Sequence, residues 1–324
     1  MRSALGSTIG PVAALLGGLL SACGAASEAP AEDNASLQAV LSIDRVEDAS
    51  REDASPSASA MAQFVILPSE ADVHDTLGAA GLRSQLPERT GCAEVVDTPG
   101  SDGAGADRAA VDGTPNARRY ELLQPLELLE AGDVSVQADD MVTRLALNLF
   151  PPSGSASGVI YTTPDQSAAP LPPDASYSIR ATGSGVIPPL TIEGQAPRTL
   201  ADVTVGGVPL ERAQQLTAGQ PLDLTWAEGA AGDRVYLELA DAERSLACVF
   251  ADEEGSGTLP GSLTARFGSG SVVRLSVHRV REAAQPDESF RLDRRGREGL
   301  GFETLSLETT VRFDFEITSA LRVD

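Results

Sequence analysis

Apolar and polar residues alternate along much of this chain, and the alternation predicts β-strands. The longest example runs from residue 305 to 317, with Leu, Leu, Thr, Val, Phe, Phe and Ile on one face and Ser, Glu, Thr, Arg, Asp and Glu on the other. Successive side chains of a strand point to opposite faces, so this pattern predicts a half-buried strand. Shorter stretches with the same period lie at 37–43, 145–149, 222–226, 235–239, 246–250 and 273–277.

Turn-forming residues separate these stretches, because Gly, Ser and Pro recur between them as in all-β proteins. One segment has a different pattern. Ser69 precedes the acidic run Glu70–Asp72, and Val73 and Leu77 follow at helical spacing before a glycine. A serine N-cap and a closing glycine are the start and stop signals of a helix. We therefore expect an all-β fold with one short helix near residues 70–80.

The run Gly194-Gln195-Ala196-Pro197 marks a candidate domain boundary. It separates a β-rich first domain, residues 37–195, from a second domain, residues 196–324, and each is long enough to bury its own core. In the second domain the alternation places Trp226 and Cys248 on buried faces. Short strands around a buried tryptophan resemble immunoglobulin-like or fibronectin-like sandwiches. An antibody-type domain would contain both cysteines of its disulfide, whereas Cys92 lies in the first half of this chain. We expect two β-sandwich-like domains, the second Ig-like.

The N-terminus has the layout of an export signal. Arg2 is followed by an apolar run from Ile9 to Leu20, which is shorter than the ~20 residues that span a bilayer. The run ends in Leu20-Ser21-Ala22-Cys23, which resembles the lipobox of bacterial lipoprotein precursors. The resemblance implies that residues 1–22 are a signal peptide and that Cys23 becomes lipid-modified.

Residues 23–36 then form a tether rich in Ala, Ser, Glu, Pro and Asp, a composition typical of flexible linkers. The partner implied by the lipid on Cys23 is the membrane. Gly24 stands where the family's inner-membrane retention signal has Asp, which favours the outer membrane, on its periplasmic or surface face. Ordinary secretion and a retained anchor are the alternatives.

Cys92 and Cys248 are the two cysteines that remain once Cys23 is assigned to lipid. In an exported protein such a pair predicts a disulfide. Two buried, reduced thiols are the alternative, because a free cysteine packs well as a small apolar side chain.

Charge and composition exclude several classes of function. The net charge is −23, so nucleic acid is not an expected partner. All 24 basic residues are arginine, which excludes a lysine-containing P-loop, a Schiff-base lysine and the S-x-x-K nucleophile.

Four arginines, Arg291, Arg294, Arg295 and Arg297, are clustered between two predicted strands. Guanidinium groups suit phosphate and carboxylate, so this segment is a candidate contact for an anion or an acidic partner. The alternative is that the arginines pair with the neighbouring acids Asp287, Glu288, Asp293 and Glu298.

Catalytic and metal motifs are missing from the sequence. His74 and His278 are the only histidines, and neither H-E-x-x-H nor G-x-S-x-G occurs. We expect His278 to be an ordinary exposed side chain on the polar face of its strand. The acidic runs at 97–112 and 252–257 are solvated loops or, alternatively, calcium sites.

We therefore expect a non-catalytic binding or envelope-structural lipoprotein without a cofactor or metal ion, with an envelope protein or a glycan as its partner. The alternative is a carboxylate-based hydrolase that acts on glycans or envelope material. Two carboxylates about 5–10 Å apart on a concave surface would favour the hydrolase.

Overall fold

The computed structural model describes residues 35–51, 55–68, 77, 90–95, 126–150, 156–165, 171–213, 215–294 and 301–324. Nearly all of them lie in strands or in the turns between strands, which confirms the all-β, sandwich-like fold class. Residues Asn34–Asp324 form one compact unit. Within the expected helix at 70–80 the structure describes Leu77 alone, in a helical conformation with its side chain buried.

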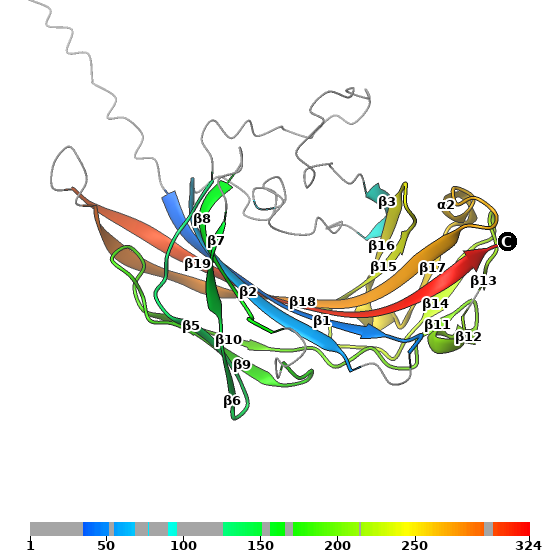
Figure 1. Cartoon of the computed structure of the whole chain (residues 1–324), viewed down its shortest axis with the longest axis horizontal. Helices are drawn as coiled ribbons and strands as arrows, with labels where there is room; N and C mark the ends of the chain where they lie inside the picture. The colour runs from blue at the N-terminus through cyan, green and yellow to red at the C-terminus, as the bar shows by residue number, and fades with distance from the viewer. Residues whose placement is uncertain are drawn as a thin grey trace, which may run out of the picture. The chain divides into compact units, whose positions relative to one another are not determined.

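The largest sheet, here called the main sheet, has 11 strands among the described residues. Its long central strands curve together in Figure 1. In spatial order it contains β3 (Gly91–Val95), β16 (Ser245–Ala251), β15 (Arg234–Ala240), β18 (Val272–Arg294), β19 (Gly301–Val323), β1 (Ala35–Asp48), β2 (Ser57–Pro68), β4 (Leu126–Leu128), β8 (Ala156–Thr162) and β7 (Ala146–Phe150), with β13 (Gln215–Leu216) beside β19.

Two smaller sheets pack on one face of the main sheet. The first covering sheet contains β10 (Leu190–Gln195), β9 (Ser176–Ala181), β5 (Val134–Ala138) and β6 (Met141–Arg144), and lies on the outer side of the curve in Figure 1. The second covering sheet contains β12 (Val208–Pro209), β11 (Thr204–Val205), β14 (Leu222–Thr225) and β17 (Ser256–Leu259). The short helices are η1 (Leu210–Arg212), η2 (Asp252–Glu254) and α2 (Gly261–Thr264).

Each covering sheet shares a separate hydrophobic core with the main sheet. The first core joins alternate residues of β1, β2 and β19, such as Leu41, Phe64 and Phe313, to the inward side chains of the first covering sheet. The second core joins β15, β16 and β18 to the second covering sheet and contains Trp226 and Cys248, as the alternation predicts. The alternating side chains explain the arrangement, because each strand offers one apolar face.

At the expected boundary of 194–197 the chain passes from the first core to the second, but this boundary does not separate two independent domains. Strands β18 and β19 are each 23 residues long and run through both halves. Strand β1 from the first half pairs in parallel with β19, for example Leu41 with Val311. The expected ranges 37–195 and 196–324 are therefore corrected to one unit with two cores, since the last strand returns to complete the first core.

Two arginines of β18 fill the space between the covering sheets. Arg279 is 2% exposed and pairs with Asp252, which is fully buried, at 2.7 Å from Nε to Oδ2. It also donates hydrogen bonds to the carbonyls of Thr199 and Ala227. Arg281 forms a bidentate ion pair with Asp233, at 2.6 Å from Nε to Oδ1 and 2.7 Å from Nη2 to Oδ2. The acidic run that begins at Asp252 is therefore not simply a solvated turn, because its first carboxylate is an internal ion-pair partner.

Candidate functional site

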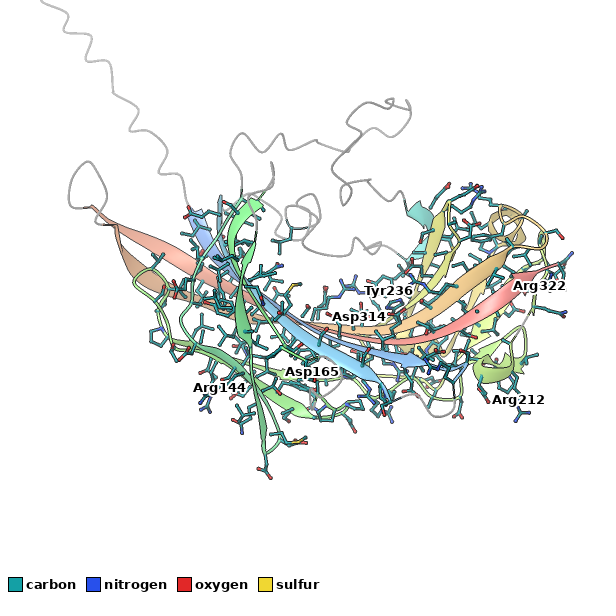
Figure 2. All side chains as sticks on the ribbon, viewed as in Figure 1. Arg144, Asp165, Arg212, Tyr236, Asp314 and Arg322 are labelled. Carbon is teal, nitrogen blue, oxygen red and sulfur yellow. A yellow bond between two sulfur atoms is a disulfide. The ribbon has the colours of Figure 1, made fainter. Side chains whose placement is uncertain are left out.

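The face of the main sheet opposite the covering sheets carries a cluster of polar side chains, and we call this face the inner face. It is built by the residues that alternate with the core positions of β15, β18, β19 and β1. The register places Tyr236, His278 and Glu316 in one row across the strands, and Val280, Asp314 and Asp44 in the next. Figure 2 shows Tyr236 and Asp314 near each other on the inner side of the curved strands.

Asp314 lies at the centre of this cluster. Its Oδ1 is 2.8 Å from Nδ1 of His278, and its Oδ2 accepts a hydrogen bond of 2.9 Å from Nη2 of Arg312. Burial acts to raise the pKa of Asp314, but His278 and Arg312 outweigh it and lower this pKa to about 2. Arg312 also approaches Glu282, at 3.8 Å. Asp314 is thus an ionised carboxylate that orients the imidazole ring.

The two ring nitrogens of His278 have different surroundings. The residue is 8% exposed, and among the described residues its Nε2 has no hydrogen-bond partner. The nearest carboxylate oxygens are Oε1 of Glu316 at 3.8 Å and Oε2 of Glu238 at 4.0 Å, both beyond hydrogen-bond distance. Burial acts to lower the pKa of His278, but Asp314, Glu316 and Glu238 together raise this pKa above its usual value.

The two flanking carboxylates are partly open to solvent. The side chains of Glu238 and Glu316 are 21% and 18% exposed. Glu238 accepts a hydrogen bond from Ser245 through Oε1, at 2.7 Å, which leaves Oε2 facing the imidazole. The hydroxyl of Ser276, two residues before His278, is also buried without a partner in the described chain. A buried polar atom normally has a hydrogen-bond partner, so this arrangement can accommodate a further polar group.

Asp44 adds a second type of carboxyl group to the inner face. It is the register partner of Asp314 across the parallel pair of β1 and β19. Burial, followed by the charge of Asp314, raises its pKa to about 6. Ser42 donates a hydrogen bond to its Oδ2 at 3.3 Å. The inner face therefore combines a carboxyl group that is protonated below pH ~6 with one that stays ionised.

The expected disulfide is present between Cys92 of β3 and Cys248 of β16. The two residues are direct partners across neighbouring antiparallel strands of one sheet. This differs from an antibody-type domain, in which the bridge joins two sheets. The bridge holds β3 on the edge of the main sheet and spans 156 residues of sequence.

Other candidates from the sequence lie at or beyond the edge of what the structure describes. Cys23, Arg295 and Arg297, with His74 and the whole acidic run at 97–112, are outside the described residues. Arg291 and Arg294 lie on β18, paired with Thr304 and Gly301 of β19, and their side chains are not described. The arginine segment therefore stays a prediction.

The expectation of an exposed His278 is wrong. The alternation of β18 correctly separates His278 from the core, but the side chain is buried on the inner face, where Tyr236 and Glu316 are its register partners and Asp314 is bonded to its ring. The pattern that could have revealed the cluster is the presence of two long strands, 272–282 and 306–316, whose polar faces each carry both acidic and basic side chains.

Within the residues that the structure describes, no group of three His, Cys, Asp or Glu side chains is arranged to hold a metal ion. None of the helices found there is long and apolar enough to cross a membrane. No protein-family model matches the chain. No curated protein matches it either.

Proposed function

We propose that this chain is a lipid-anchored, non-catalytic binding module of the bacterial cell envelope, and that the inner face of the main sheet is its binding surface. The observation that carries the proposal is the Nε2 atom of His278, which lies between the carboxylates of Glu238 and Glu316 and has no hydrogen-bond partner among the residues that the structure describes. The anchor rests on the sequence Leu20-Ser21-Ala22-Cys23.

A hydroxyl-rich ligand, such as an envelope glycan, fits these three groups best. A protonated His278 donates a hydrogen bond, whereas Glu238 and Glu316 accept them. A sugar hydroxyl both accepts from the imidazolium and donates to a carboxylate. Hydrogen bonds to charged groups contribute about 1.5–3 kcal/mol each, so loss of one should be measurable.

The test is calorimetric titration of the mature chain with soluble peptidoglycan fragments and with neutral oligosaccharides of the same length. We expect Glu316→Gln and His278→Gln to weaken binding by about tenfold or more. Glu211→Gln, at an exposed glutamate of η1, is the matched control and should bind as wild type does. Equal affinities for all four proteins would disprove the role of the inner face.

The anchor is tested separately, by incorporation of radiolabelled palmitate. The wild-type precursor should be labelled and Cys23→Ala should not. Equal labelling of both proteins would refute lipidation at Cys23 and leave the binding proposal unaffected.

A carboxylate-based hydrolase is the second candidate, and the pair Asp44 and Asp314 favours it. With a pKa of about 6 Asp44 is protonated at mildly acidic pH, while Asp314 beside it, with a pKa of about 2, is ionised, and acid–base hydrolysis uses one carboxyl group of each kind. Both oxygens of Asp314 already accept contacts from His278 and Arg312, which reduces its capacity as a base. Release of reducing sugar that disappears in Asp44→Asn would support the hydrolase over the binding module.

A further inference from the structure

The outer face of the first covering sheet carries two arginines that flank one serine. Ser135 of β5 is the register partner of Arg144 on β6 and of Arg180 on β9. Because neighbouring strands lie about 4.8 Å apart, the two arginines start about 10 Å from each other with Ser135 between them. Their strand neighbours Val134, Val136 and Ile179 point into the first core, so these three side chains face away from it.

Neither arginine has a neutralising partner in the part of the chain that the structure describes. Among the described residues, no ion pair or hydrogen bond involves the side chain of Arg144 or Arg180, and both residues are exposed. Arg279, Arg281 and Arg312, by contrast, all have carboxylate partners. In a chain of net charge −23, two adjacent unpaired guanidinium groups form a local positive site.

A cavity of about 500 Å³ lies over this site. Arg144, Arg180 and the hydroxyl-bearing residues Ser135, Thr182 and Thr191 line it, and Asp133 is the one acid in its wall. Thr182 accepts a hydrogen bond from the backbone N–H of Asp133 at 2.8 Å, which leaves its hydroxyl hydrogen free to donate. Leu145, Pro189 and Leu190 supply an apolar wall. The volume is within the usual range for small-ligand sites, about 300–1,000 Å³.

A second depression of about 550 Å³ adjoins the cavity and shares Arg180 with it. Ser178 lies in its lining, and the Oγ atom of this serine is buried without a hydrogen-bond partner among the described residues. A ligand larger than a single anion therefore has polar groups to contact on both sides of Arg180.

We propose that this cavity binds an anionic sugar, with its phosphate or carboxylate group held between Arg144 and Arg180. Guanidinium groups bind both anions through paired N–H donors. The hydroxyls of Ser135, Thr182 and Thr191 contact the sugar oxygens, and the apolar wall contacts its carbon skeleton. The site is on the opposite side of the first covering sheet from the main sheet, so it is independent of the inner-face proposal.

The experiment is calorimetric titration of the mature chain with glucose 6-phosphate, glucuronate, inorganic phosphate and glucose. We expect one of the charged sugars to bind more tightly than phosphate alone, and glucose not to bind measurably. Arg144→Ala and Arg180→Ala should each weaken binding by about tenfold or more. Arg144→Lys, which keeps the charge but not the paired donors, should fall between wild type and Arg144→Ala. Binding of the wild type should weaken in high salt.

Arg212→Ala is the matched control, because Arg212 is an exposed arginine of η1, far from the first covering sheet in Figure 2. This variant should bind as wild type does. Preference for glucose 6-phosphate over glucuronate would assign the ligand to phosphosugars, and the reverse to uronic acids. Failure of both charged sugars to bind at millimolar concentration would overturn the proposal, as would equal binding by wild type and the two alanine variants. Both arginines are exposed, so loss of folding does not confound the result.

Discussion

Replacing Arg279 should reveal how strongly the two halves of the chain depend on each other. In Arg279→Met the carboxylate of Asp252, which is fully buried, loses the guanidinium group that pairs with it, and the carbonyls of Thr199 and Ala227 lose their donor. Removal of one partner of a buried ion pair costs about 3–5 kcal/mol. We expect the free energy of unfolding to fall by that amount.

The single tryptophan provides the assay for this variant. The indole N–H of Trp226 donates a hydrogen bond of 3.0 Å to the backbone carbonyl of Asp252. The fluorescence of Trp226 therefore reports on the surroundings of the Arg279–Asp252 ion pair during urea unfolding. Arg274→Met is the control on the same strand, since Arg274 is 61% exposed and 4.0 Å from Glu238. Exposed pairs of this kind contribute less than about 1 kcal/mol.

A double variant separates the two causes of the loss. Arg279→Met combined with Asp252→Asn removes the unpaired charge but does not restore the hydrogen-bond donors that Arg279 supplied. The double variant should therefore recover part of the stability. If Arg279→Met unfolds at the same urea concentration as Arg274→Met, the ion pair of Arg279 with Asp252 does not stabilise the fold.

Three further changes test other contacts. The folded-state pKa of Asp44 is raised from 3.8 to about 6, so its contribution to stability is present at low pH and is lost as the pH rises through about 6. Asp44→Asn should therefore flatten this part of the pH–stability curve and raise the free energy of unfolding at pH 8 by up to about 3 kcal/mol. An unchanged curve would show that Asp44 is not the group responsible for this pH dependence. Replacing Cys92 and Cys248 with Ala should lower stability by about 5 kcal/mol in the chain-entropy model, and wild type in reductant should shift equally in urea. Gly158 has φ +124, and a Cβ there would meet the carbonyl oxygen of Leu128, so Gly158→Ala should lower the thermal midpoint through strain between β4 and β8, whereas Gly268→Ala, in open space, should not.

The sequence predicts the local structure well because alternation is a local property. The strand expected at 305–317 is present within Gly301–Val323, and the stretches 235–239 and 246–250 are present as neighbouring antiparallel strands. Near Pro197 the chain passes from the first core, at Ala196, to the second, at Leu200, but β19 returns to the first core.

Long-range pairing could not be predicted in the same way. Nothing in the alternation of β1 specifies that β19 is its parallel neighbour, since any strand with one apolar face satisfies the same pattern. The inner-face cluster depends on this pairing, because it brings Asp44 beside Asp314. For the same reason the alternation of β18 alone could not show that His278 is buried.

The parallel pairing of β1 with β19 also determines the order in which the fold can be completed. Leu37 pairs with Leu307, so β1, the first strand that the structure describes, receives one of its two neighbours only when β19 is available. The hairpin of β1 and β2 can form early, since these strands are antiparallel neighbours in sequence. Until β19 arrives, however, one edge of β1 and the apolar positions of the first core stay exposed. Contacts of such large sequence separation slow folding and lengthen exposure to aggregation. The first core can therefore be completed only late, although it contains β1, the first strand that the structure describes.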